Sequence, residues 1–284
     1  MAVVQLGDVT VQRIVEHEIP VYHPSEFFDE ATAEAVEPYR ASLTPHALCP
    51  QTGRMVMPVQ SYLVRTRHHC ILIDTCVGCR KNYAEPPEWH QRSNEVWLSN
   101  LQAAGVGTDD IDYVFCTHLH SDHCGWNTRL VDGRWVPTFP NAKYIFARDE
   151  YRAMEDEYHQ IFIDNVEPIA EAKQAVLVEL DYALDDDIWL EPTVGHSVGH
   201  VAIHVKSRRS RAAMCGDLIH SPLQLAEPDW TCNSDYDLAA SAATRKRFLR
   251  EHCDTDTLVL TAHFPSPSMG HVISRGDAYD FNYL

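Results

Sequence analysis

The sequence of 284 residues is 45% hydrophobic and carries 41 acidic and 23 basic side chains, a formal net charge of −18. A chain of this length can bury a sizeable core. The acidic balance argues against nucleic-acid binding, which uses basic patches to meet phosphates. No apolar run reaches the roughly 18 residues that a membrane span needs, so no membrane partner is expected.

The cysteines indicate a reducing environment. There are nine, an odd number, scattered along a chain too large to need disulfide bonds. Residues 1–6 contain no basic side chain and lead into a strand rather than a signal core. We therefore expect reduced thiols and a cytoplasmic protein. Cys76 and Cys79 form a C-x-x-C pair, but no second pair completes a zinc ribbon, so a functional role for them is not expected.

The first third of the chain predicts strands around an irregular segment. Residues 3–6 and 9–15 alternate around Gly7-Asp8, which is a hairpin signal. Residues 16–53 are rich in proline and predict an irregular segment with one small helix, either a cover or dimer contact or a surface meander. Strands follow at 59–64 and 70–74, and a helix that starts at Ser93 or Asn94 is expected to end at Gly105.

The stretch from Thr117 to Gly125 reads T-H-L-H-S-D-H-C-G and follows a short apolar strand pattern at 111–116. His118 and His120 are two apart, so on an extended strand end they project to one side. Asp122 and His123 come next, where the chain must turn. Imidazole and carboxylate groups are the ligands that suit zinc. The stretch therefore predicts a metal site at the end of a strand.

The rest of the chain predicts further strands in order, with a helical pattern at 148–174 that is broken near 165–168. Strands are expected at 135–138, 143–147, 176–180, 188–193, 201–205, 212–215 and 257–261, with a helix from Asp237 to about His252 and closing strands at 272–274 and 279–283. Strands in two batches, each followed by helices, suit two stacked sheets covered by helices on both sides. We expect one domain, residues 1–284, of the α/β class with an αββα sandwich.

Four segments resemble the metallo-β-lactamase-fold hydrolase superfamily. T-H-x-H-x-D-H-x-x-G resembles its signature, and residues 195–200, 215–220 and 261–264 are similar to its later segments. The resemblance covers roughly residues 55–275. It implies that two Zn²⁺ ions are bound: one by His118, His120 and His196, the other by Asp122, His123 and His263, with Asp217 bridging them.

The resemblance also implies chemistry. A hydroxide held between the two metals would attack an electrophilic carbon or phosphorus, with Asp122 as proton shuttle. No G-x-S-x-G serine elbow is present. His220 stands three residues after the bridging aspartate, where acyl-homoserine lactonases often carry tyrosine. It is predicted either to donate a hydrogen bond or proton to the substrate or to pack beside the site.

The later segments resemble the branch that contains lactonases and methyl parathion hydrolase. The first interpretation is therefore a lactone or ester hydrolase that acts on a small molecule. A homodimer is the oligomeric state considered. A phosphotriesterase is the second, and a β-lactamase the third, because no export signal is seen. An iron-dependent sulfur dioxygenase shares the first motif, but the complete set of second-metal ligands favours the dinuclear site.

Overall fold

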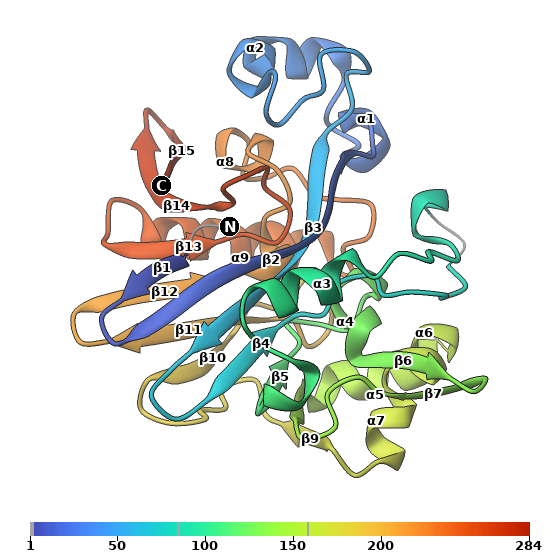
Figure 1. Cartoon of the computed structure of the whole chain (residues 1–284). Coiled ribbons are helices and arrows are strands. Elements are labelled where there is room, and N and C mark those ends of the chain that lie inside the picture. Colours follow the sequence, from blue (N-terminus) through green and yellow to red (C-terminus); the bar gives the residue numbers. More distant parts are fainter. Residues whose placement is uncertain (1–2, 84–85, 158) are drawn as a thin grey trace. The chain divides into compact units, whose positions relative to one another are not determined.

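The computed structural model describes residues 3–83, 86–157 and 159–284. Within them the chain forms two compact units. Unit 1 comprises Met1–Glu16 and Val59–Tyr182, and unit 2 comprises His17–Pro58 and Ala183–Leu284. Each unit contains one large β-sheet with its own helices, and Figure 1 traces both.

Unit 1 contains most of a seven-stranded mixed sheet in the order β1-β2-β3-β4-β5-β8-β9, and only the end of β2 (residues 17–20) and the start of β3 (residues 56–58) are assigned to unit 2. The strands β4, β5, β8 and β9 run parallel, while β1 pairs antiparallel with β2 and β3 with β4. The bounds are β1 Val3–Leu6, β2 Val9–Pro20, β3 Val56–Arg65, β4 Cys70–Ile73, β5 Tyr113–Phe115, β8 Lys143–Ala147 and β9 Ala175–Val178. A separate ribbon pairs β6 Thr128–Val131 with β7 Arg134–Pro137.

The helices of unit 1 are α3 Val96–Ala103, α4 Ser121–Cys124, α5 Arg148–Glu157, α6 His159–Asn165 and α7 Glu167–Glu171. Trp97 and Leu101, one turn apart on α3, are buried in one core cluster with Leu72 of β4 and Val114 of β5. The apolar face of this helix thus packs on the parallel strands, whose own side chains are buried. Short 3₁₀ turns lie at Pro87–Trp89, Thr108–Asp110 and Gly125–Asn127.

Unit 2 contains a six-stranded sheet in the order β10-β11-β12-β13-β14-β15. Its strands are β10 Ile188–Pro192, β11 Val201–Ser207, β12 Ser210–Met214, β13 Thr257–Leu260, β14 Met269–Arg275 and β15 Ala278–Tyr283. The pair β12 and β13 is parallel and the other neighbours are antiparallel. Its helices are α1 Pro24–Phe27, α2 Ala33–Leu43, α8 Leu223–Ala226 and α9 Leu238–His252, with a 3₁₀ turn at Gly216–Leu218.

Helix α9 begins where the sequence predicts. The Asp237 side chain accepts a hydrogen bond from the Ala240 amide at 2.9 Å, which caps the helix. Phe248 of α9 is fully buried in one cluster with Ala213 of β12 and Val259 of β13. The helix therefore covers the middle strands of this sheet.

The observed elements confirm the predicted α/β class with two mixed sheets and helices. The segment 16–53 is more regular than expected. Strand β2 runs on to Pro20, and α2 has 11 residues, with Thr32 as its N-cap. The prolines of this segment do not prevent helix formation. Pro24 occupies the first position of α1, where its missing N–H costs nothing, and Pro38 is accommodated inside α2. The expected single domain stays a prediction.

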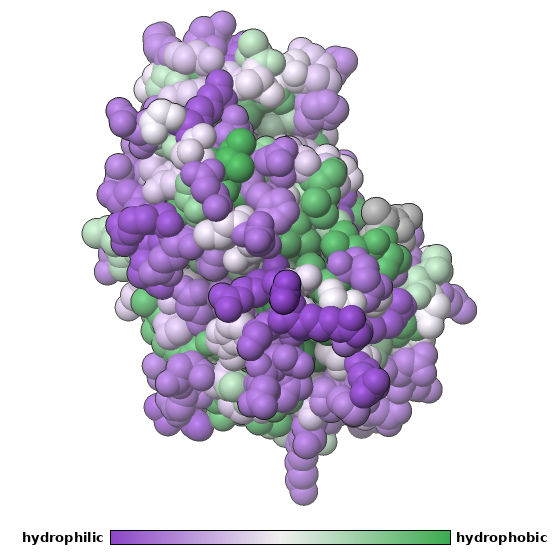
Figure 2. Space-filling view, turned by 90° about the vertical axis from the view of Figure 1, so that its left-hand side faces the viewer, coloured by the Kyte–Doolittle hydropathy of each residue, from purple (hydrophilic) through white to green (hydrophobic). Residues whose placement is uncertain are grey.

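The predicted break in the helical stretch 148–174 is observed, because α6 ends at Asn165 and α7 begins at Glu167. Among the described residues, none of the helices combines the length and apolar character that crossing a bilayer requires. The face drawn in Figure 2 is mostly hydrophilic, with hydrophobic areas interspersed. This agrees with the high charge of the sequence.

Candidate metal centre

Unit 1 brings four of the predicted donors together. Strand β5 ends at Phe115, and His118, His120, Asp122 and His123 follow in the loop and in the first turn of α4. The His118 ring centroid lies 4.5 Å from that of His120 and 4.1 Å from that of His123. Asp122 Oδ2 lies 3.5 Å from His123 Nε2. We call these four residues the unit-1 donor set.

Asp74 holds this loop from the end of the neighbouring strand β4. Its carboxylate accepts hydrogen bonds from the Thr117 amide at 2.7 Å, the Thr117 hydroxyl at 2.9 Å and His123 Nδ1 at 2.9 Å. A carboxylate only accepts, so His123 carries its proton on Nδ1 when it is neutral. The Thr117 hydroxyl lies 3.1 Å from His118 Nδ1 and can accept its proton in turn. Both imidazoles are thereby set with Nε2 as the lone-pair nitrogen.

The last residue of the motif, Gly125, is required by close backbone packing. A Cβ atom at Gly125 would lie 1.9 Å from the Val77 carbonyl oxygen. The Gly125 amide donates to the Cys76 carbonyl at 2.7 Å, and the Trp126 amide donates to the Thr75 carbonyl at 2.8 Å. The motif loop is therefore fixed against the loop that carries Asp74.

Unit 2 brings together donors that are distant in the sequence. His196 lies between β10 and β11, Asp217 in the turn after β12, and His263 after β13. Asp217 Oδ1 lies 2.9 Å from His263 Nε2, and Asp217 Oδ2 lies 3.4 Å from His196 Nε2. These three residues, the unit-2 donor set, are all buried. A carboxylate with a different imidazole at each oxygen has the form that a bridging ligand requires.

Hydrogen bonds also orient the unit-2 donor set. His196 Nδ1 lies 2.8 Å from Asp235 Oδ1, and His263 Nδ1 donates to the Pro58 carbonyl at 2.9 Å. The Asp217 amide donates to His200 Nε2 at 3.0 Å, so His200 must donate through Nδ1 to Thr193 Oγ1 at 2.8 Å. Both donor imidazoles again direct Nε2 at the carboxylate.

Burial raises the pKa of Asp235, but the hydrogen bond and charge of His196 outweigh this effect, and the pKa lies below its usual range. Asp235 therefore remains a carboxylate. Its other oxygen, Oδ2, lies 3.8 Å from the guanidinium of the buried Arg245. The Asp235 carboxylate can thus hold His196 in place, and the Arg245 guanidinium in turn stabilises the negative charge of Asp235.

His220 lies beside the unit-2 donor set, buried between Asp217 and an aromatic wall. Its Nε2 is 3.1 Å from Asp217 Oδ2, and its ring meets Phe27 edge-on with centroids 5.1 Å apart. Burial alone would lower the pKa of His220, but Cys232 and Asp217 outweigh this and raise it. Within the described residues, His220 Nδ1 is buried without a hydrogen-bond partner.

Several supporting residues were not assigned a role from the sequence. Cys232 is fully buried, and its sulfur and a ring nitrogen of both His196 and His220 lie within 4.8 Å of one another. Asp235 and Cys232 stand in stretches without a recognisable ligand spacing, so no local signal pointed to them, and His200 was expected only as part of the family-like segment 195–200. Asp74 was expected only as the last residue of the strand at 70–74.

Cys76 and Cys79 have separate partners. Cys76 Sγ lies 3.3 Å from Ser61 Oγ, and the Cys79 thiol donates to the Asn94 carbonyl. Burial raises the pKa of Cys79 to about 11 and that of Cys76 further above its ordinary value. Both therefore remain protonated thiols, which are poor nucleophiles and poor ligands.

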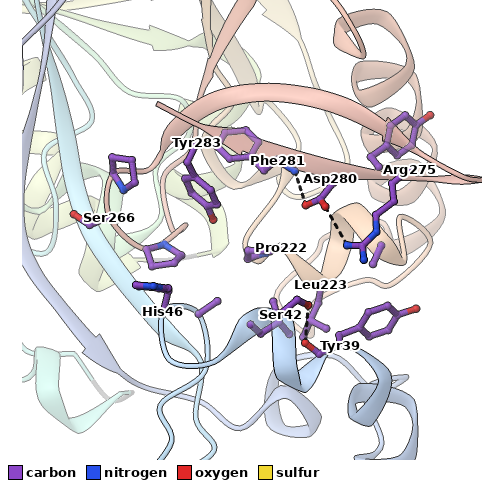
Figure 3. A pocket seen from close by; sticks show the side chains of 16 residues that line it. Tyr39, Ser42, His46, Pro222, Leu223, Ser266, Arg275, Asp280, Phe281 and Tyr283 are labelled. Atoms are coloured by element: carbon purple, nitrogen blue, oxygen red, sulfur yellow. Dashed lines mark hydrogen bonds and ion pairs between the residues drawn. The ribbon is translucent and has the colours of Figure 1, made fainter.

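A cavity of about 510 Å³ lies within unit 2. Its walls are mainly aromatic, proline and aliphatic side chains, and Figure 3 labels Tyr39, Pro222, Leu223, Phe281 and Tyr283 among them. Pro265 also lines the cavity. Arg275 and Asp280 form an ion pair of 3.0 Å at its edge. Pro222 and Pro265 each stand two residues after a histidine of the region just described, His220 and His263 respectively.

Comparison with known proteins links these residues to a family. The family model of the Metallo-beta-lactamase superfamily matches residues 54–266. A curated relative, the N-acyl homoserine lactonase AiiA of Bacillus thuringiensis subsp. kurstaki, is 27% identical over 186 residues. That match covers 61% of this chain and 66% of the relative, which is just under two thirds of its length.

Two solved structures share the fold. One is AidC, described as a dizinc quorum-quenching lactonase with a bound product, with a TM-score of 0.84, 21% identity, and coverage of 100% of this chain and 97% of that one. The other is the hydrolase AbOPH of the beta lactamase superfamily, with a TM-score of 0.80, 22% identity, and coverage of 99% and 96%. The predicted fold class is thereby confirmed.

Proposed function

Because the chain belongs to the metallo-beta-lactamase superfamily, we propose that it is a metal-dependent hydrolase that opens a lactone or cleaves an ester. The family prediction made from the four sequence segments is confirmed by a match that spans most of the chain. The activity of the curated relatives, which are N-acyl homoserine lactonases, makes a lactone the first substrate class to test.

We propose that two divalent ions, most simply zinc, are held by the two donor sets. The assignment follows the order of the family segments: His118, His120 and His196 for one ion, Asp122, His123 and His263 for the other, and Asp217 for both. A set of five imidazoles and two carboxylates, all buried except the half-buried His120, suits zinc chemically.

One observation carries this proposal. In His118, His123, His196 and His263, Nδ1 is engaged by an oxygen of the protein, at 2.8–3.1 Å. Histidines that bind metals through Nε2 characteristically donate their other N–H to a carboxylate, hydroxyl or carbonyl oxygen. This shared arrangement supports the assignment of these histidines as metal ligands, because it recurs although their protein partners come from different elements.

When bound, a pair of such ions would activate water and polarise the substrate carbonyl. The residues of the chain supply the proton chemistry. Asp122 is buried next to His123, where its carboxylate can take a proton from the attacking water and return it to the leaving group. His220 can donate a hydrogen bond to the developing oxyanion or a proton to the departing oxygen.

Metal analysis and a substrate panel test the proposal. The protein is purified without added metal and assayed on lactones, aryl esters and phosphotriesters, with His118→Ala as the inactive variant and the exposed His68→Ala as the control. We expect two zinc ions per chain and lactone or ester hydrolysis in wild type and His68→Ala. Turnover of phosphotriesters alone would favour a phosphotriesterase, turnover of β-lactams a β-lactamase, and bound iron with oxygen-dependent turnover a dioxygenase.

We further propose that the apolar cavity of unit 2 receives the apolar part of the substrate. Its walls suit an alkyl chain. Two of its lining residues, Pro222 and Pro265, stand two positions after His220 and His263 in the sequence. Ala226→Phe places a ring into the cavity, whereas Asp277→Phe adds the same ring at an exposed turn outside it. Ala226→Phe should raise KM for long-chain lactones more than for short-chain ones. An equal effect on both chain lengths would assign the cavity no part in substrate binding.

A further inference from the structure

We propose that Glu191, His204 and His252 form an additional binding site for a transition-metal cation such as Zn²⁺ in unit 2. The three residues share no member with the donor sets described above. They come from two adjacent strands and the end of a helix: Glu191 from β10, His204 from β11, and His252 as the last residue of α9. One donor atom of each lies within 4.8 Å of the others.

The strand register creates half of this site. In the antiparallel pair of β10 and β11, Trp189 stands opposite His204. Glu191, two residues along β10, lies on the same face of the sheet as Trp189, diagonally across from His204. Glu191 Oε2 consequently reaches His204 Nε2 at 2.6 Å. A carboxylate and an imidazole are thus held in contact by the backbone pairing itself.

The helix end supplies the third donor. The His252 ring centroid lies 5.7 Å from that of His204 and 4.3 Å from that of Phe248, one turn earlier in α9. His204 is also stacked on Trp189, with centroids 5.0 Å apart and planes at 9°. Both imidazoles are therefore positioned by aromatic neighbours, and little side-chain entropy remains to be lost when an ion binds.

A second observation points to a ligand. His252 Nε2 is buried, and within the described parts of the chain it has no hydrogen-bond partner. A buried polar nitrogen without a partner is costly.

The charges around the site fit a cation held by one carboxylate. Arg247 Nη1 binds the other oxygen of Glu191, Oε1, at 2.6 Å, which leaves Oε2 directed at His204. Arg247 also meets Glu251 at 3.2 Å, so its positive charge is shared with a second acid. Two imidazoles and one carboxylate are the ligand set of many zinc sites with one position open to water. Because the three residues come from two strands and a helix of unit 2, an ion bound here would tie these elements together, and we assign the site a structural role.

Zinc counting in matched variants tests this site. The purified protein, stripped with a chelator, is dialysed against Zn²⁺ and compared with His252→Ala, His204→Gln and the control His68→Ala, each checked for folding by circular dichroism. Wild type and His68→Ala should bind one more Zn²⁺ per chain than the other two variants. The comparison between variants holds whatever the occupancy of the main donor sets.

Thermal unfolding supplies the second readout. A bound ion would link β10, β11 and α9, so Zn²⁺ should raise Tm of wild type and His68→Ala more than that of His252→Ala and His204→Gln. Esterase or lactonase turnover should be unaffected, because these residues lie outside the proposed catalytic machinery. Identical zinc counts and identical Tm shifts in all four proteins would overturn the proposal and reduce the cluster to a Glu–His–Arg polar network.

Discussion

The two donor sets reach similar chemistry by different routes. The unit-1 donor set comes from six consecutive residues after one strand, and one carboxylate, Asp74, holds both Thr117 at the start of its loop and His123. The unit-2 donor set comes from three loops, and each member has its own support: Asp235 for His196, the Pro58 carbonyl for His263, and His200 for the Asp217 backbone. In the unit-1 donor set, Asp74 alone positions two parts of the site, whereas in the unit-2 donor set each donor is positioned by a different residue.

The largest expected effect falls within the unit-1 donor set. Asp122→Asn keeps the shape of the side chain but removes its ability to accept a proton. A general acid–base contribution is about 10²–10⁴-fold, so kcat should fall by that factor while KM changes little. Elemental analysis of the same sample controls for lost metal. Near-normal turnover with full metal content would remove Asp122 from proton transfer.

The supporting carboxylates test the contrast directly. Removing such a partner typically costs about 10–100-fold in metal affinity or activity. Asp74→Asn should lie at the upper end, because Asp74 serves both Thr117 and His123, and Asp235→Asn at the lower end. Metal affinity measured by competition with a chelator distinguishes them. Equal losses would contradict the idea that support is concentrated in unit 1.

His220 tests whether the unit-2 region contributes more than ligands. His220→Ala should retain the metal content and lose at least about tenfold in kcat on esters with poor leaving groups, which need a proton. Aryl esters, whose leaving groups depart as anions, should be affected less. Equal losses on both would indicate oxyanion binding instead, and unchanged kcat on both would make His220 a packing residue.

The smallest expected effect concerns two fully buried cations, Lys81 in unit 1 and Arg245 in unit 2. Lys81 in unit 1 donates to Thr128 Oγ1 and the Asp164 carbonyl, and burial lowers its pKa to about 7. Arg245 in unit 2 stays charged against Asp235. In unfolded chains the pKa of lysine is about 10.4, so between the two values the unfolded state binds more protons.

Stability contributed by Lys81 should therefore rise as the pH increases above about 7, by up to about 1.4 kcal/mol per pH unit. Urea unfolding at pH 7, 8 and 9 should show wild type gaining stability relative to Lys81→Met. Lys246→Met, which removes an exposed lysine, serves as the control and should run parallel to wild type. A constant difference between wild type and Lys81→Met would show that Lys81 keeps its proton.

The same contrast explains what could be predicted from the sequence. His118, His120, Asp122 and His123 stand close together in the sequence after a strand pattern, so spacing alone indicated a metal site. His196, Asp217 and His263 were found only through family-like segments, because the contacts between them depend on sheet topology. Asp235 could not be predicted at all, since its partner His196 lies on another loop and no spacing relates the two.

The regular elements followed a similar rule. The strands β4, β5, β8 and β9 and the capped helix α9 were predicted because their signals are local, namely apolar runs and Asp237 at the N-cap, whereas the parallel pairing of these strands was not predicted. Helix α2 is longer than the one small helix expected within residues 16–53, because Pro38 is a strong helix breaker in isolation but lies inside this helix. Its tolerance reflects packing, since Val36 and Leu43 are buried in a core cluster with Trp230.

Gly125 shows how a pattern that looks local can record a distant contact. Its φ of −62° is open to any residue, so its own backbone does not demand glycine. The demand comes from the Val77 carbonyl and from Gly78, whose own Cβ position would lie 2.8 Å from the Gly125 backbone. The final letter of the motif thus carries information about a loop elsewhere in the chain. A match to the motif therefore also indicates that the backbone at position 125 packs closely against the loop that contains Val77 and Gly78.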